Sequence, residues 1–294
     1  MPNIVDDKSE YCTPFILDRL KVHSAKHEAD SNPPPFFLGL NGVQGAGKTV
    51  LQQGLPTVVF SMDDIYLAHD DQLNLAKTYS DNPLLQHRGQ PPTHDLQLGL
   101  SVFESLRYNK PTKIPQYNKA AFNGQGDRVP ECEWEEVNNT ASKIKVVLFE
   151  GWCTGFRPLD QSVLKQKWEE AIKAKQSGSY NGRLAYNRLE DLTVINQALK
   201  SYNALTDQLD ALIHIDAADS QYVYQWRLQQ EATLRAAKGT GMTDEQVHHF
   251  VDGYYPSYEL FSDTLRAGIF GGDSGRQLRL VVGPDRKVKE VIRI

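Results

Sequence analysis

The segment GVQGAGKT, residues 42–49, constrains the fold of this chain more than any other feature. It matches the spacing G-x-x-x-x-G-K-[ST], in which the glycines let backbone N–H groups curl around a phosphate. Lys48 would neutralise the phosphate charge, and Thr49 would offer its hydroxyl to Mg²⁺. We therefore expect a strand-to-helix turn that binds a nucleotide through Gly42, Val43, Gln44, Gly45, Ala46, Gly47, Lys48 and Thr49.

Five short apolar runs predict the strands of a central sheet. They are FFLGL (36–40), TVVFS (57–61), KVVLF (145–149), ALIHI (211–215) and LRLVV (278–282). Because nearly every side chain in them is apolar, both faces should be covered by helices, as is typical of parallel strands. The turn GPD (283–285) then introduces the alternating run KVKEVIRI, which predicts an edge hairpin. We expect a three-layer α/β/α fold of the P-loop NTPase type, with a five-stranded, mainly parallel sheet and this C-terminal hairpin.

The segments between these runs predict helices and domain limits. Helical patterns cover 101–108, 189–206, 221–238 and 244–252. Gly239 is suited to a C-cap, and Thr243 with Gln246 forms a capping box. Residues 1–31 predict a leader helix, which the prolines of SNPPP (31–35) separate from a main domain at 32–294. Residues 161–190, rich in Lys, Gln, Ser and Gly, carry no chemical motif, and we interpret them as a surface insertion.

Composition excludes several classes of protein. Lys and Arg total 32 against 37 for Asp and Glu, and the resulting charge of −5 argues against general binding to nucleic acid. The three cysteines, Cys12, Cys132 and Cys153, are far apart and favour neither disulfides nor a zinc site. No apolar run reaches the roughly 20 residues that span a bilayer. We expect a soluble, cytoplasmic protein that binds neither membrane nor nucleic acid; the sequence indicates no oligomeric state.

Acidic residues follow two of the strands at the edge where open α/β sheets bind ligands. The run SMDDIY places Asp63 and Asp64 after the second strand, and VVLFEGW places Glu150 at the end of the third. A carboxylate there can accept a hydroxyl proton or hold Mg²⁺. We predict Asp63 as the base and, with Thr49 and Glu150, as a metal ligand. For Asp64 a catalytic role and a capping role for the following helix stay open.

Two polar loops and one helix complete the candidate site. The loops RGQPPTHD (88–95) and YNKAAFNGQGDR (117–128) are dense in groups that suit an anionic or hydroxylated small molecule. The candidates for substrate binding are Tyr66, Arg88, His94, Asp95, Tyr117, Lys119 and Arg128. On the helix WRLQQE, Arg227 and Glu231 stand four residues apart, so they either pair with each other or belong to a lid that brings Arg227 to the transferring phosphate.

The ordered set of these motifs resembles a known family. GVQGAGKT, SMDDIYL, RGQPPTHD, the 117–128 loop, FEGWCTGF, WRLQQE and GMTDEQVHHFVDGYYPSY follow one another between about residues 36 and 261. They are similar to the P-loop small-molecule kinases that include uridine kinase, phosphoribulokinase, pantothenate kinase and D-glycerate 3-kinase, most closely to fungal relatives of the last. The resemblance implies ATP and Mg²⁺ as cofactors, Asp63 as the catalytic base, Glu150 in the magnesium shell and the helix of Arg227 as a lid.

Two departures from that family leave an alternative open. Only TVLQQGLP (49–56) separates the phosphate-binding segment from the second strand, which is short for a crossover helix, and Gly253 stands where relatives tend to carry arginine. The main hypothesis is an ATP-dependent kinase that phosphorylates a hydroxyl of a small metabolite, with glycerate as the choice by resemblance. The alternative is a nucleotide-binding regulatory or scaffold protein. A GTPase is disfavoured because neither NKxD nor DxxG occurs.

Overall fold

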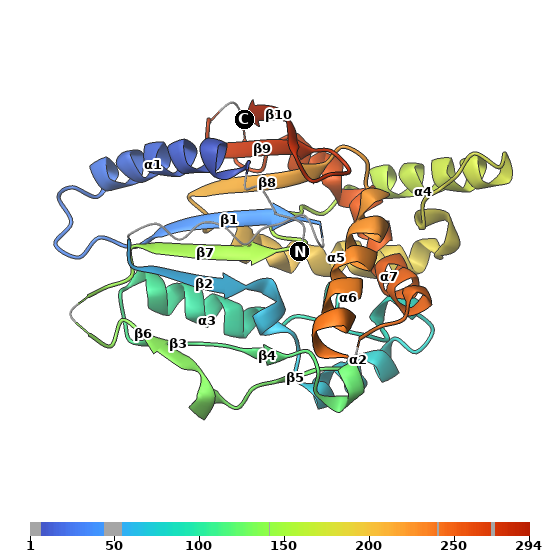
Figure 1. The fold of residues 1–294 in the computed structure, drawn as a ribbon, viewed down its shortest axis with the longest axis horizontal. Helices are drawn as coiled ribbons and strands as arrows, with labels where there is room; N and C mark the ends of the chain where they lie inside the picture. Colours follow the sequence, from blue (N-terminus) through green and yellow to red (C-terminus); the bar gives the residue numbers. More distant parts are fainter. Residues whose placement is uncertain (1–6, 44–54, 141, 240, 272–273) are drawn as a thin grey trace.

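The computed structural model describes residues 7–43, 55–140, 142–239, 241–271 and 274–294, and its centre is a six-stranded sheet (Figure 1). In spatial order the strands are β10 (Val288–Arg293), β9 (Gln277–Val282), β8 (Ala211–Ala217), β1 (Phe36–Gly42), β7 (Val146–Gly151) and β2 (Thr57–Ser61). Five strands run parallel, and β10 pairs antiparallel with β9 at one edge. The predicted α/β fold with a mainly parallel sheet and an edge hairpin is therefore confirmed.

Seven helices surround this sheet in the described part of the chain. They are α1 (Ser9–Lys26), α2 (His69–Thr78), α3 (Leu96–Arg107), α4 (Gln161–Gln176), α5 (Leu189–Thr206), α6 (Tyr222–Lys238) and α7 (Asp244–Arg266). The short pairs β3 (Thr112–Ile114) with β6 (Glu135–Val137), and β4 (Tyr117–Asn118) with β5 (Asp127–Arg128), lie outside the main sheet. No helix among the described residues is both long and apolar enough to cross a membrane.

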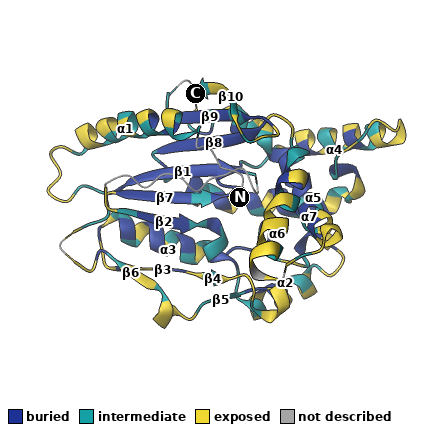
Figure 2. Ribbon diagram, viewed as in Figure 1, coloured by how far each residue is buried: buried dark blue, intermediate teal, exposed yellow. Residues whose placement is uncertain are grey.

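The strands predicted from apolar runs are buried as expected, and β1 and β8 are buried along their whole length (Figure 2). Each face of the sheet packs against its own hydrophobic core. On one face the rings of Phe37 and Phe149 lie 5.0 and 4.9 Å from the ring of Phe103 on α3. On the other face Trp226 of α6 and Phe15 of α1 belong to the cluster around the outer side chains of β1 and β8. Burial of this area on both faces is the main stabilising term.

Local capping signals determine where two of the helices begin or end, whereas tertiary packing determines how far helix α7 extends. Thr243 and Gln246 form the predicted capping box, and Gly239 ends α6 with a left-handed φ of 71°. Helix α7 nevertheless continues fourteen residues beyond the predicted end at Asp252, through Pro256 to Arg266. The proline removes one backbone donor, but its turn carries buried tyrosines, so tertiary packing overrides the local preference.

The predicted surface insertion forms α4 and the 3-10 turn η5 (Leu184–Tyr186). Leu164 of α4 and Leu184 of η5 are buried in the larger core cluster, whereas most of the remaining α4 surface is exposed. This amphipathic arrangement explains how a polar, motif-free segment still attaches firmly to the domain. Its status as an insertion stays a prediction.

Gly253, one of the two departures from the family pattern, lies inside α7, and a Cβ built on it would meet nothing within 4 Å. Glycine in a helix interior is less favourable than alanine by roughly 0.5–1 kcal/mol. We therefore expect Gly253→Ala to raise the free energy of unfolding by about that amount, measured by urea denaturation. The matched control is Gly99→Ala in α3, where the new Cβ would lie 2.9 Å from Ile65 Cδ1 and should destabilise the protein. A lower unfolding midpoint for Gly253→Ala would contradict this expectation.

Candidate active site

The carboxyl edge of the sheet carries the start of the phosphate-binding segment. Gly42 ends β1, Val43 follows it, and Asn41 donates from Nδ2 to the carbonyl oxygens of Trp152 (3.1 Å) and Thr154 (2.8 Å). These bonds join the end of β1 to the turn after β7. Of the predicted cradle, residues 44–49, which include Lys48 and Thr49, lie outside the described residues, as does most of the short link at 49–56. Their roles stay predictions.

Ser61 brings two of the predicted acidic residues together. It is the register partner of Glu150 across β2 and β7. Its hydroxyl donates to Glu150 Oε1 over 2.8 Å and accepts from the backbone N–H of Asp63 over 3.2 Å. Asp63 and Glu150 therefore share one polar bridge at the sheet edge. Sequence reasoning missed Ser61, and the signal that could have found it is its position two residues before Asp63.

Asp64 takes part in a cap, but of the turn in which it lies and not of the helix that follows, as the capping alternative had it. Its Oδ2 accepts from the backbone N–H of Ser61 over 3.0 Å and closes the capping box of the 3-10 turn η1 (Met62–Ile65). Burial raises the pKa of Asp64 to about 6, with the charge of Asp63 adding to the rise, and the Ser61 N–H opposes it. Asp64 is thus a structural neighbour of the candidate base.

Asp63 is paired with a lysine from the second predicted loop. Lys119 Nζ lies 2.5 Å from Asp63 Oδ2. The two residues are 56 positions apart in the chain, and both were predicted as site residues. An ion pair stabilises the charged carboxylate, which is the form that a general base requires. Any acceptor whose hydroxyl approaches Asp63 would also meet the ammonium group of Lys119.

Arg88 shapes the loop that carries Lys119. Its guanidinium donates to the carbonyl oxygens of Gly124 (2.6 Å), Gln125 and Lys119 (3.5 Å). The far side of the loop is fixed to the start of α2, where the ring of His69 stacks on Phe122 with centroids 3.8 Å apart. The structure therefore joins the two loops that were predicted to form one substrate site.

Tyr66 and His94 are buried together beside Asp63. Their rings are stacked at 4.4 Å, and His94 Nδ1 lies 2.7 Å from the hydroxyl of Tyr202. Burial lowers the pKa of His94 to about 3, so the imidazole is neutral at physiological pH. Burial also raises the pKa of Tyr66 well above its ordinary value. The buried pair of Tyr66 and His94 is consequently uncharged at pH 7, in contrast to the charged loops 88–95 and 117–128.

Asp95 and Arg128 pair with each other and support Tyr66. Arg128 Nη2 lies 3.1 Å from Asp95 Oδ2 and donates to the backbone oxygen of Tyr66 over 3.0 Å. Asp95 Oδ1 also caps α3 by accepting from the N–H of Leu98. Tyr117, the remaining candidate, lies edge-on to Tyr66 with ring centroids 5.4 Å apart. The seven predicted substrate residues are thus joined by contacts around Tyr66 and the 117–128 loop.

Helix α7 contributes residues that the sequence did not single out. Gln90, which is 2% exposed, donates to the carbonyl oxygen of Gly253 over 2.8 Å and accepts from Ser257 Oγ over 2.5 Å. The hydroxyl of Tyr254 donates to the backbone oxygen of Arg88 over 3.4 Å. Helix α7 is therefore attached to the 88–95 loop at both Arg88 and Gln90. The run YYPSY lies beyond the helix end predicted at Asp252, and a single sequence does not reveal which loop it contacts.

Arg227 is paired with Glu231 within its own helix, which is one of the two arrangements predicted from the sequence. Its Nη2 lies 3.0 Å from Glu231 Oε2, and its Nη1 donates to Gln230 Oε1 over 2.7 Å. The guanidinium carbon lies 5.1 Å from the centre of the Phe250 ring on α7. Arg227 therefore sits between the two neighbouring helices, and its action on a phosphate stays a prediction.

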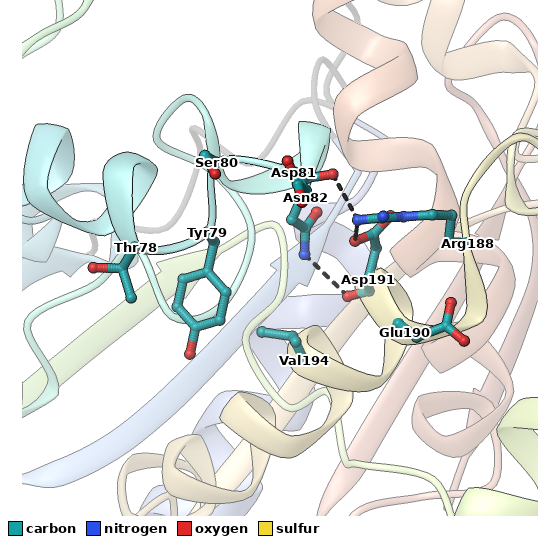
Figure 3. Close-up of a pocket in the computed structure, with 9 residues that line it drawn as sticks. All are labelled: Thr78, Tyr79, Ser80, Asp81, Asn82, Arg188, Glu190, Asp191 and Val194. Carbon is teal, nitrogen blue, oxygen red and sulfur yellow. Dashed lines mark hydrogen bonds and ion pairs between the residues drawn. The ribbon is translucent and has the colours of Figure 1, made fainter.

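A pocket of about 200 Å³ lies elsewhere, between the end of α2 and the start of α5 (Figure 3). Arg188 bridges it, with Nη2 2.7 Å from Asp191 Oδ1 and donating to the backbone oxygen of Asp81 over 2.7 Å. None of the predicted site residues lines this pocket. Its arginine is already satisfied by protein oxygens, so the pocket does not compete with the sheet edge as a reaction site.

The donor set at the sheet edge fits Mg²⁺ held with the help of a nucleotide. Asp63 and Glu150 offer carboxylate oxygens, the ligand type that this ion prefers. No group of three or more His, Cys, Asp or Glu able to hold a metal occurs in the described part of the chain. Magnesium in such sites needs only one or two carboxylates, because water and substrate phosphates complete its shell. The residues present are compatible with that arrangement.

The chain is similar in sequence to known kinases. The chain is 37% identical over 244 residues to the "Uncharacterized kinase mug58" of Schizosaccharomyces pombe, covering 79% of this chain and 82% of that protein. It is 34% identical over 284 residues to the chloroplastic D-glycerate 3-kinase of Arabidopsis thaliana, covering 92% of this chain and 57% of that protein.

A solved structure of D-glycerate 3-kinase from Cryptococcus neoformans matches with a TM-score of 0.85 and 36% identity, covering 98% of this chain and 99% of the other. No protein-family model matches the chain. The sequence similarity over most of the chain and the shared fold give the same result. The chain belongs to the family of ATP-dependent P-loop kinases related to D-glycerate 3-kinase.

Proposed function

We propose that this protein transfers the γ-phosphate of ATP to a hydroxyl group of a small anionic metabolite, with D-glycerate as the first candidate. The observation that carries the proposal is the position of Asp63, whose backbone N–H is linked to Glu150 through the Ser61 hydroxyl and whose carboxylate lies 2.5 Å from Lys119 Nζ of the 117–128 loop. A base, a candidate metal ligand and a cation thus meet at the edge where the phosphate-binding segment begins. The names of the relatives support both the reaction and the acceptor.

In this proposal the reaction is dominated by positioning and electrostatics, and Asp63 serves both as base and as metal ligand. Lys48 and the glycine-rich backbone hold the phosphates, and Asp63 takes the proton from the acceptor hydroxyl. Thr49, Asp63 and Glu150 would hold Mg²⁺, which when bound supplies positive charge to the phosphate oxygens. Arg227 would add a further positive charge at the transferring group.

The charges around Asp63 favour an acidic acceptor over a neutral one. Lys119 lies beside Asp63, and Arg88 and Arg128 lie in the same two loops. Arg88 and Arg128 are bonded to carbonyl and carboxylate oxygens of the protein. Lys119, whose side chain is 58% exposed, is therefore the cation that is placed to meet the carboxylate of an acceptor. Tyr66 and Tyr117 supply hydroxyl groups for the remaining polar atoms of a small molecule.

We further propose that this reaction takes place in the cytoplasm, on a single domain comprising residues 32–294. The three cysteines, which all lie in the described part of the chain, form no disulfide there, and this agrees with a reducing compartment. The acidic net charge of −5 supports a small-molecule acceptor over nucleic acid.

A coupled assay for ADP tests the proposed function. The protein would be incubated with Mg²⁺, ATP and, one at a time, D-glycerate, L-glycerate, other sugar acids, nucleosides and pantothenate. We expect ADP to form with D-glycerate and at background rate with the neutral acceptors. Nucleotide binding without acceptor-dependent ADP would contradict a kinase and support the regulatory alternative, whereas ADP formation with a different acceptor would correct only the substrate.

A further inference from the structure

Glu231 on α6 is a buried carboxylate whose two oxygens serve different partners. It is 3% exposed. Its Oε2 lies 3.0 Å from Arg227 Nη2, one turn earlier on the same helix, and its Oε1 accepts from the backbone N–H of Met242 over 2.8 Å. Met242 lies in the connection that leads from α6 into α7. Glu231 thus joins Arg227 to the connection between the two helices.

Not every hydrogen-bond donor of Arg227 has a partner among the described residues. A guanidinium has five N–H groups in a planar fork. The partners of Arg227 are Glu231 at Nη2 and Gln230 at Nη1, whereas the buried Nε has no partner among the residues that the structure describes. The cation is only 19% exposed and lies over the ring of Phe250. A buried donor without a partner is unfavourable unless a ligand completes it, and an oxyanion is the ligand that suits a guanidinium.

Fixing Arg227 in advance has a direct consequence for phosphoryl transfer. A long arginine side chain loses much rotamer freedom when it binds an anion, and a carboxylate that already orients it reduces this loss. Glu231 is well suited to this task because its own position is fixed by the Met242 N–H and by burial.

We propose that Glu231 is a positioning residue, which holds the guanidinium of Arg227 oriented for the phosphate that is transferred. This inference rests on the proposed function, since it gives a role to a residue that acts through Arg227. It predicts that Glu231 affects the rate of transfer and has little effect on acceptor binding.

The connection between α6 and α7 has a second ion pair that serves as a control. Arg235 donates to the carbonyl oxygen of Met242, and its Nη2 lies 2.7 Å from Asp244 Oδ1. This pair holds the same connection, whereas the side chain of Arg227 is bonded to Glu231 and Gln230. Loss of the Arg235–Asp244 pair therefore loosens the connection without changing the partner of Arg227.

The test is a double-mutant cycle on kcat with Glu231→Gln, Arg227→Ala and both together. Glutamine keeps the shape and the acceptor for Met242 but turns a donor toward the guanidinium. We expect Arg227→Ala to lower kcat about 100-fold, as for loss of one transition-state donor, and Glu231→Gln to lower it about 10-fold with the KM for the acceptor unchanged. The double variant should equal Arg227→Ala alone, and Asp244→Asn should keep the wild-type kcat. Wild-type kcat in Glu231→Gln, multiplied losses in the double variant, or an equal loss in Asp244→Asn would each overturn the proposal.

A second variant covers the case in which Glu231→Gln does not fold. A Cβ added at Gly241, in the exposed connection, would lie 2.7 Å from Glu231 Oε1 and 2.9 Å from Arg235 Cγ, so Gly241→Ala should displace the carboxylate without removing it, and Asp244→Asn controls for the disturbance at Arg235. We expect this variant to lower kcat in the same direction, and an unchanged kcat would overturn the proposal. Failure of the proposed function is distinguishable, because it would leave the wild-type protein without acceptor-dependent ADP formation.

Discussion

Asp63→Asn is expected to lower kcat about 1000-fold while nucleotide binding stays intact, because an amide cannot accept the proton of the acceptor hydroxyl. Asparagine has nearly the volume of aspartate, so the surrounding loops should keep their places. The substitution also removes the charge that pairs with Lys119 at 2.5 Å. The measurement is steady-state kcat with saturating Mg-ATP and the acceptor identified by the ADP assay, together with calorimetric titration of the nucleotide.

The matched control for Asp63 is its neighbour, Asp64→Asn. The side-chain oxygen of asparagine can still accept from the Ser61 N–H, so the capping box of η1 should persist and kcat should stay near the wild-type value. Lys48→Ala provides the opposite profile, with reduced nucleotide affinity. Full activity in Asp63→Asn would show that the base is another group, and equal losses in both carboxylate variants would mean that the pair acts jointly.

The sheet could be predicted from the sequence because its strands are buried on both faces. Runs such as FFLGL and ALIHI have almost no polar positions, and their observed limits, Phe36–Gly42 and Ala211–Ala217, differ from the predicted ones by two residues at one end. Helix limits were predictable where caps are local, as at Thr243 and Gly239. The C-terminal half of α7 was not, because its stability comes from tertiary burial around Pro256.

The candidate site also has a part that could be predicted from the sequence and a part that depends on tertiary contacts. Parallel strands end at the same edge of a sheet, so the sequence could place Asp63 and Glu150 together there. Because β2 and β7 are adjacent, both residues contact Ser61. The pairing of Lys119 with Asp63 depends on the path of the 117–128 loop, in which Phe122 and Asn123 adopt left-handed φ values of 50° and 54°. Side chains other than glycine rarely adopt this conformation, so no local pattern predicts it. Such contacts are visible only after the loop is placed.

The second large effect is expected at Asp216, which is buried at the end of β8 between two arginines. It is 5% exposed, and its oxygens lie 2.8 Å from Arg266 Nε and 2.6 Å from Arg279 Nη2. The buried ring of His214 lies 3.8 Å away, and burial lowers the pKa of that histidine to about 4, so it is neutral at pH 7. Asp216 is therefore the carboxylate that balances two positive charges beside the sheet.

Asp216→Asn should lower the free energy of unfolding by about 3 kcal/mol at pH 7, because it leaves Arg279 without its counter-charge and Arg266 with only the exposed Asp263. Urea denaturation measures this loss. The control is Asp263→Asn, which also removes a carboxylate from Arg266 but at a position that is 60% exposed, and it should change stability by about 1 kcal/mol or less. Equal losses in the two variants would show that burial does not decide the strength of these pairs.

The contribution of Asp216 should also depend on pH in one direction. Burial alone would raise the pKa of Asp216, but its bonds to Arg266 and Arg279 and its neighbour His214 outweigh it, so the folded-state pKa is lower than the ordinary value of 3.8. The unfolded chain then binds a proton more readily than the folded protein as the pH falls. The stabilisation is complete above the ordinary value and is lost as the pH falls through the folded-state pKa. The difference in unfolding free energy between the wild-type protein and Asp216→Asn should therefore be constant from pH 7 to about 5 and shrink below about 4; a difference that grows in acid would contradict the assigned ion pairs.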